Sequence, residues 1–359
     1  MGLKNGSVIN EIFWIRTLAC LAVVLVHSVN TTLDNYEHSI TQTEEYLLIA
    51  LRFAAFFGTP AFIFISEVLL AHAYPNQVPK DFFKKRIKFL LVPFAFMAVV
   101  FAFVLSDSFM GFWEEVLFNL FLGGYTGYFI LIIFQFYLLH VLLTKHLRKW
   151  NPKKVLFWAF IINTAYLGFF HFTEPAAVPL GEYIWLRGHW VPFIGWIFYF
   201  VLGYYCGRNY ELLKNKIQKH KKLIFIWPTA AFLAMVFLVR GDIIDVVSSK
   251  RIDNLVYTTG VIFFIILLTM KVRKVPSFVS LISRHSFHIY LVHTLFLYYL
   301  PPIEGVNPLA YFLLAAVYCV LSSIITAKIL LSLSSVSNLL IGKPIVTPQD
   351  LRKANEGTS

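Results

Sequence analysis

The sequence predicts an all-α polytopic membrane protein with about ten transmembrane helices and both termini in the cytoplasm. Of its 359 residues, 58% are hydrophobic and only 14% are charged, against about 25% charged residues in soluble domains. The apolar runs are long enough to cross a bilayer as helices, and the alternating polarity of membrane strands is absent. Such a chain cannot cover itself with polar surface, which excludes a soluble globular protein.

Ten apolar runs are the expected spans. The first run has no small-residue cleavage site and is longer than the core of a signal peptide, so we expect it to be retained. The expected spans are 12–32, 46–72, 88–106, 127–144, 154–171, 191–208, 222–239, 254–270, 285–301 and 309–332.

Charge in the connections orients these spans. Lys and Arg are concentrated in 75–88, 145–154, 208–222 and 271–284, whereas the intervening connections are acidic or mixed. By the positive-inside rule, the four basic connections and both termini are cytoplasmic. The net charge of +12 is therefore mainly topological, and no nucleic-acid partner is expected.

We expect one transmembrane domain over 10–335, followed by a short cytoplasmic tail over 336–359. Cys20, Cys206 and Cys319 fall in different spans, with no Cys-x-x-Cys and no spacing typical of metal ligands. We therefore expect three small buried residues and no metal site.

Two basic side chains lie in the first span. Arg16 and His27 are eleven positions apart, which at about 100° per residue puts both on one helix face, roughly 16 Å apart along the axis. Ionisable groups inside a membrane helix are costly and by default indicate a site. The alternative is that Arg16 extends to the inner headgroups and His27 is a satisfied polar residue near the outer end.

The second span combines helix-breaking and polar residues. Gly58 and Pro60 predict a kink that frees backbone groups. Ser66 and Glu67 follow further in, with Glu67 at the depth of Arg16 on the first span. Either these groups line a cavity, or Glu67 and Arg16 form a buried ion pair that makes both tolerable.

Basic residues also enter the third span. Lys85, Arg86 and Lys88 can hold phosphates, such as those of a nucleotide-bearing acyl donor. Positive-inside placement explains the same residues without a ligand.

Three further polar positions are predicted at membrane depth. Gln135 in the fourth span is an amide that must find a partner. His293 lies about nine residues into the ninth span, roughly 14 Å along the helix, and Tyr290 is on a neighbouring face. A second imidazole at this depth favours a site at His27.

Two outer connections are longer than simple turns. Residues 107–126 are expected to contain an interfacial helix, with Gly123 and Gly124 shaping an outer turn before the fourth span. Residues 172–190 combine aromatic and basic groups. They suit either a carbohydrate-binding mouth or an aromatic belt at the headgroups.

Several of these motifs together resemble acyltransferase family 3, a family of multi-pass membrane acyltransferases, over about residues 10–335. The sequence departs from the family at Glu67, which stands in place of the glycine of its Ser-Gly pair. It also departs at Phe89, which replaces the second arginine of its Arg-x-x-Arg motif. The residues that carry the resemblance are Arg16 and His27 with ten residues between them, Ser66, Arg86, and the Ile289-Tyr290-Leu291-x-His293 run.

Within the family, the chain is similar to members that modify or export poly-N-acetylglucosamine. The residues that carry this likeness are Phe57-Gly58-Thr59-Pro60, Tyr128-Phe129 with Gln135-Phe136, Gly195-Trp196-Ile197-Phe198-Tyr199-Phe200 with Leu202-Gly203, and Ile341-Gly342-Lys343.

The resemblance implies a membrane O-acyltransferase in a bacterial cell membrane. The donor would be a cytoplasmic acyl-CoA, such as acetyl-CoA or succinyl-CoA, and the acceptor a hydroxyl of an extracellular polysaccharide or other cell-surface glycan. Membrane lipids and components of a polysaccharide synthase are the further partners that it implies.

The same resemblance distributes roles among the candidate residues. His27 would be a general base or a transient acyl carrier, and Arg16 would neutralise donor charge. Arg86, with Lys85 and Lys88, would hold the phosphates of the donor. The remaining candidates, for orienting groups and lining the cavity, are His293, Tyr290, Ser66, Glu67, Tyr128 and Gln135.

Two other functions remain open at this point. An exporter or flippase for a surface polysaccharide would use the same polar groups to line a conduit. A sensor or scaffold would have no turnover.

Overall fold

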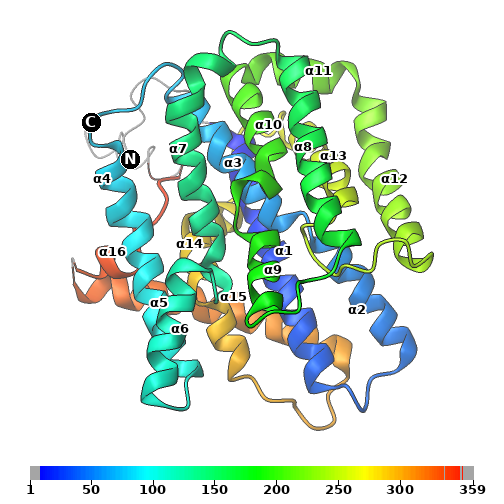
Figure 1. The fold of residues 1–359 in the computed structure, drawn as a ribbon, viewed down its shortest axis with the longest axis vertical. Coiled ribbons are helices and arrows are strands. Elements are labelled where there is room, and N and C mark those ends of the chain that lie inside the picture. The colour runs from blue at the N-terminus through cyan, green and yellow to red at the C-terminus, as the bar shows by residue number, and fades with distance from the viewer. Residues whose placement is uncertain (1–8, 335, 348–349, 351–359) are drawn as a thin grey trace. The chain divides into compact units, whose positions relative to one another are not determined.

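The structure is a computed structural model that describes residues 9–334, 336–347 and 350. Helices and turns make up this described part of the chain, which contains no strand (Figure 1). Most of the expected cytoplasmic tail beyond 347 lies outside the described residues.

Eight helical stretches among the described residues are long and apolar enough to cross a membrane, and a bent pair of helices over 181–208 makes a ninth if it is one span. Every expected span lies mainly within a helix. The helix Ser277–Tyr298 is long enough to cross but is not one of the eight, because Arg284 and three histidines make it more polar. The prediction of an all-α polytopic membrane protein is therefore confirmed, while the orientation of the termini stays a prediction.

The chain forms two compact units, and α1 (Asn10–Asn35) contributes to both. The first unit comprises the chain up to Arg16, Thr59–Lys80 and Phe129–Val275. Within it, α12 packs along α13, and α10 packs along α8 (Figure 1). Its other elements are α3 (Gly58–Ala73), α7 (Phe129–Leu147), α8 (Pro152–Phe172), α9 (Gly181–Trp190), η3 (Phe193–Trp196), α10 (Ile197–Arg208), α11 (Tyr210–Lys219), α12 (Lys221–Arg240) and α13 (Ile252–Thr269).

The second unit comprises Thr17–Gly58, Asp81–Tyr128 and the chain from Pro276 onward. Within it, α14 packs along α15, and α5 packs against α6. Its other elements are α2 (Gln42–Ala55), α4 (Phe82–Arg86), the π-helix η1 (Ile87–Leu91), α5 (Val92–Leu105), α6 (Phe109–Phe121), η2 (Thr126–Tyr128), α14 (Ser277–Tyr298), α15 (Pro308–Leu333) and α16 (Ser337–Leu340).

Local sequence signals set several helix boundaries. The side chain of Thr41 accepts from the backbone of Glu44, and Glu44 accepts in return, so a capping box begins α2. Asn151 and Asn307 cap α8 and α15, each followed by a proline in the first turn. At the kink predicted from Gly58 the helix is interrupted for two residues, because α2 ends at Ala55 and α3 begins at Gly58.

The two outer connections contain helices of their own. The helix expected in 107–126 is α6, and the turn expected at Gly123 follows it, with Gly123 in a left-handed conformation (φ 66°). Residues 181–190 of the second connection form α9, which meets the following helix at an angle of 40°. The start of the sixth span is therefore broken.

Two amide side chains stabilise this break within the first unit. The Gln135 side chain donates to the carbonyl of Val191 and accepts from the amide of Phe193, both at 2.9 Å. Asn163 donates to the carbonyl of Gly195 at 2.9 Å and accepts from the amide of Phe198 at 3.1 Å. These side chains satisfy backbone groups that a broken helix leaves free.

Close backbone approach joins α3 to α10 in the first unit. A Cβ added at Gly207 would lie 2.3 Å from the carbonyl oxygen of Val68 and 2.8 Å from its Cα. Both obstacles are backbone atoms, so they cannot move aside as the end of a flexible side chain would. Glycine at 207 is therefore required for this helix pair to pack closely.

We expect Gly207→Ala to destabilise the protein by about 1–3 kcal/mol, because overpacking forces the two backbones apart. The measurement is the midpoint of thermal unfolding of the detergent-solubilised chain. Gly168→Ala is the matched control, because its Cβ would meet only the Ile252 side chain, at 3.6 Å. Equal midpoints for the two variants would contradict the prediction.

Candidate functional site

Two histidines meet inside the second unit. His27 lies on α1 and His293 on α14, with their ring centroids 5.0 Å apart and their planes at 66°, an edge-on contact. His293 is fully buried, and His27 is partly buried. The similar depths predicted for these two residues therefore correspond to direct contact.

The surroundings of His293 determine which of its ring nitrogens carries the hydrogen in the neutral form. Its Nδ1 lies 3.0 Å from the carbonyl of Ile289 and 2.9 Å from the carbonyl of Tyr290. Because carbonyl oxygens only accept, Nδ1 carries a hydrogen and donates it to them. In the neutral ring, Nε2 then holds the lone pair, and this buried atom has no hydrogen-bond partner among the described residues. His293 is thus held with a basic nitrogen available.

Hydrogen bonds connect the same part of α14 to η2 and to α15. The hydroxyl of Tyr290 donates to the carbonyl of Thr126. The hydroxyls of Thr126 and Thr294 are 2.9 Å apart and share a hydrogen bond. The thiol of Cys319 on α15 donates to the carbonyl of His293 at 3.2 Å. These contacts fix the turn of α14 that carries Tyr290 and His293.

The basic entry to the third span also belongs to the second unit. Lys85 forms an ion pair with Asp81 one turn earlier, and this hydrogen bond is the main reason that the pKa of Asp81 is lowered. The guanidinium of Arg86 lies 4.9 Å from the centre of the Phe82 ring, and the ammonium of Lys88 lies 5.5 Å from the Phe89 ring. All three cations therefore have local partners before any ligand binds.

Arg16 belongs to the first unit and is only 8% exposed. Its guanidinium lies 5.9 Å from the ring centre of Phe13, one turn earlier on α1. Among the described residues, no ion pair joins Arg16 to Glu67. The partner that the sequence offered for Glu67 is therefore wrong.

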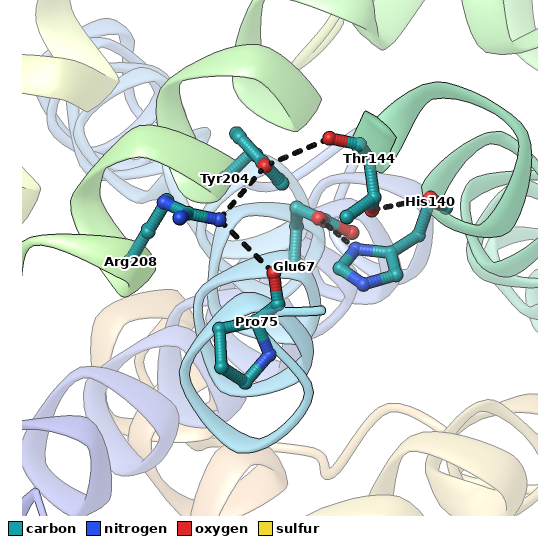
Figure 2. A network of polar contacts seen from close by, with 6 residues as sticks. All are labelled: Glu67, Pro75, His140, Thr144, Tyr204 and Arg208. Carbon is teal, nitrogen blue, oxygen red and sulfur yellow. Dashed lines mark hydrogen bonds and ion pairs between the residues drawn. The ribbon is translucent and has the colours of Figure 1, made fainter. Parts of the chain in front are cut away.

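The actual partner of Glu67 is His140. The ring Nδ1 of His140 on α7 donates to Glu67 Oε1 on α3 at 2.6 Å, and the two side chains are 2% and 0% exposed (Figure 2). The second carboxylate oxygen of Glu67 and the Nε2 of His140 are buried and have no hydrogen-bond partner in the part of the chain that the structure describes. A carboxylate and an imidazole thus share one hydrogen bond, and one further polar atom of each has no hydrogen-bond partner among the described residues.

A chain of hydrogen bonds continues from this pair to the end of α3. Thr144 donates to the carbonyl of His140 at 2.5 Å, and Tyr204 on α10 donates to the carbonyl of Thr144 at 3.3 Å. Arg208 donates to the Tyr204 hydroxyl at 3.5 Å and to the carbonyl of Pro75 at 3.0 Å (Figure 2). The network links α3, α7 and α10 within the first unit.

The other cavity candidates have different surroundings. The hydroxyl oxygen of Ser66 on α3 is buried and has no partner among the residues described. Gln135 is engaged with the backbone at the α9–η3 break, which accounts for its amide without a substrate. Tyr128 is partly buried at the end of η2.

Cations cover the aromatic rings of the outer segment 172–190 in the first unit. The ammonium of Lys250 lies 3.7 Å from the ring centre of Trp190, and the guanidinium of Arg187 lies 5.0 Å from it. Arg187 also lies 4.9 Å from the Tyr183 ring. Burial, reinforced by Arg187, lowers the pKa of Lys250 well below its ordinary value. Trp190 and Tyr183 are therefore engaged in cation–π contacts in this structure.

The structure therefore brings His27, His293 and Tyr290 into one region of the second unit. In the first unit, Arg16 and Glu67 do not form the ion pair that the sequence suggested. His140, Thr126 and Thr294 were not predicted from the sequence. The signal for His140 was present, because an imidazole inside an apolar run is as costly there as it is at His27. The three cysteines are buried and free, as expected.

Comparison with known proteins identifies the family. The family model of the acyltransferase domain matches residues 9–328. The protein named "Putative membrane-bound acyltransferase YfiQ" from Bacillus subtilis (strain 168) is 39% identical over 300 residues, which are 80% of this chain and 81% of that protein. No solved structure gives a significant match to the chain.

Two staphylococcal proteins are also similar, and both are named "Probable poly-beta-1,6-N-acetyl-D-glucosamine export protein". The one from Staphylococcus aureus (strain MSSA476) is 29% identical over 295 residues, which are 80% of this chain and 82% of that protein. The one from Staphylococcus epidermidis is 27% identical over 298 residues, which are 80% of this chain and 81% of that protein. The resemblance inferred from the sequence motifs is thus confirmed, and this chain belongs to acyltransferase family 3 as a multi-pass membrane acyltransferase of bacteria.

Proposed function

We propose that this protein transfers an acyl group from a cytoplasmic acyl-CoA to a hydroxyl group of an extracellular polysaccharide. The observation that carries the proposal is the contact between His27 and His293, two imidazoles on helices of a membrane acyltransferase. Ionisable groups at such positions are costly, and histidine is the side chain best suited to move a proton near neutral pH.

The chemistry requires a base and a place for the leaving thiolate. His27 takes the proton of the acceptor hydroxyl as the hydroxyl oxygen attacks the thioester carbonyl. The carbon–sulfur bond then breaks, and coenzyme A leaves as a thiolate that takes up a proton. In the alternative route, His27 first accepts the acyl group on a ring nitrogen and then passes it to the hydroxyl. In both routes His293, whose Nδ1–H tautomer is fixed by two carbonyls, orients the ring of His27.

The remaining candidates serve the two substrates. Arg16 neutralises charge on the donor, and the positive field of Arg86, Lys85 and Lys88 attracts the anionic donor to the membrane. Four of the remaining candidates line the substrate path, namely Tyr290, Tyr128, Ser66 and Glu67. Gln135 acts only indirectly, by holding the α9–η3 break in place. The staphylococcal relatives are named for export of poly-β-1,6-N-acetylglucosamine, and we propose this polymer as the acceptor. The transferred group in this proposal is acetyl or succinyl. Polysaccharide synthase components and membrane lipids are the expected partners.

Export of a polysaccharide is the second candidate function, and it rests on those same relatives' names. An exporter would use the polar residues as the lining of a conduit and would need no acyl donor. The two functions differ in where polymer accumulates when the histidine pair is removed.

We expect His27→Ala to lower the rate of acyl transfer at least about 100-fold, because a general base contributes 10²–10⁴-fold. The ester content of surface polysaccharide is measured in a strain with wild-type protein levels. His38→Ala is the control, because His38 is an exposed histidine in the turn after α1. Unmodified polymer outside the cell supports transfer. Polymer trapped inside supports export, and normal ester content with His27→Ala rules out the proposed base.

The Glu67–His140 pair provides a separate test of what stabilises the first unit. Removing His140 leaves the Glu67 carboxylate buried without its partner, so we expect His140→Ala to destabilise the protein by about 3–5 kcal/mol. Adding Glu67→Gln removes the buried charge and is expected to recover a large part of that loss. Thermal unfolding of wild-type, single and double variants measures both effects. If the losses of the two single variants simply add, the pair is not coupled.

A further inference from the structure

A basic pocket in the first unit is lined by none of the residues assigned above to the reaction. Its volume is about 450 Å³, which falls within the range of small-molecule sites, about 300–1,000 Å³. One wall is the end of α3 and the loop after it, residues 73–77, and the other is the end of α7 with Lys145, Arg148 and Lys149. The second wall belongs to the connection that the positive-inside rule places in the cytoplasm.

The lining carries three cations and no carboxylate. Lys145, Arg148 and Lys149 are spaced three and four positions apart, so they share one side of the helical turn. No ion pair among the described residues involves Lys145 or Lys149, whereas Lys85 at the third span is already paired with Asp81. The wall formed by the end of α7 therefore carries a concentration of positive charge, which favours binding of phosphate oxygens.

Hydrogen bonds hold both walls in place. Arg148 donates to the side chain of Asn76 at 3.0 Å and so joins the two walls directly. Arg208 donates to the carbonyl of Pro75 at 3.0 Å, which anchors the loop (Figure 2). Tyr205 donates to the carbonyl of Leu147 at 2.9 Å, which fixes the end of α7. The cavity is thus shaped before a ligand arrives.

The lining also contains groups that suit a nucleotide base. Tyr74 supplies an aromatic ring, and Asn76 and Gln77 supply amide groups. Stacking on a ring and hydrogen bonding to amides are common ways in which proteins hold bases. A bare phosphate would use only the cations, so the combined chemistry favours a phosphorylated nucleotide.

We propose that this pocket binds the phosphorylated nucleotide portion of the acyl donor, with Lys145 and Lys149 contacting its phosphates. The identification of the ligand as the donor rests on the proposed function, while the nucleotide-phosphate chemistry rests on the pocket itself. An anionic lipid headgroup would present the same phosphate charge, and the experiment below separates the two sources.

The test measures binding of coenzyme A to the full-length purified chain in nanodiscs of phosphatidylcholine. Lys145→Gln/Lys149→Gln is the pocket variant. Lys153→Gln/Lys154→Gln is the matched control, because it removes the same charge from the same connection at residues that do not line the pocket. We expect the pocket variant to raise the Kd for coenzyme A about tenfold, since each hydrogen bond to a charged group contributes measurably. The control is expected to stay within about twofold of wild type, and adenosine 3′,5′-bisphosphate should compete for the site.

Two results would overturn the nucleotide site. Equal weakening in both double variants would mean that only the overall charge matters. An unchanged Kd for coenzyme A, with loss of preference for nanodiscs containing phosphatidylglycerol, would assign the pocket to a lipid headgroup.

Acyl transfer by the same samples separates this inference from the proposed function. If the wild-type chain transfers acyl groups while the pocket variant keeps its KM for acyl-CoA and its Kd for coenzyme A, the pocket proposal fails and the function stands. If the wild-type chain binds coenzyme A through Lys145 and Lys149 but transfers nothing, the function fails and the nucleotide site stands.

Discussion

The structure depends first on the need to satisfy backbone polar groups where no water can do so. A regular helix meets this need by itself, but the break between α9 and α10 does not. Gln135 and Asn163 supply both a donor and an acceptor to the backbone on either side of that break. The two amides explain how an irregular segment can persist beside membrane helices, and why polar side chains occur there without being ligands for a substrate.

Ionisable side chains inside the spans also need partners where no water is present, and two pairs of them are in contact. In the second unit, His293 gives its Nδ1 hydrogen to backbone carbonyls and contacts His27 through the ring. In the first unit, Glu67 and His140 share one hydrogen bond. His293 and His140 each leave a buried Nε2 without a hydrogen-bond partner among the described residues, so the pairs differ in the partner of the ring, which is a second imidazole in one pair and a carboxylate in the other. The hydrogen bond between Glu67 and His140 joins α3 to α7.

Sequence patterns predicted the helices well and the side-chain partners only in part. Long apolar runs and capping residues are local features of the sequence, so the spans and the interruption at Gly58 could be predicted. Depth along a helix can also be counted, and it placed His27 and His293 at compatible levels. Depth does not specify which way a side chain faces, so Arg16 was offered to Glu67 although the carboxylate meets His140. The start of α14 at Ser277, eight residues before the expected span, was missed because its polar first turns carry little hydropathy signal.

The contact between Glu67 and His140 explains how this chain accommodates a glutamate where the family's Ser-Gly pair has a glycine. A glycine at 67 would bury no charge and would require nothing from α7. A glutamate there costs several kcal/mol in desolvation unless a partner is fixed within hydrogen-bond distance, and His140 supplies that partner at 2.6 Å. His140 in turn loses its only side-chain hydrogen bond among the described residues if Glu67 is absent. The two residues therefore form one structural pair across α3 and α7, and neither side chain is well accommodated without the other.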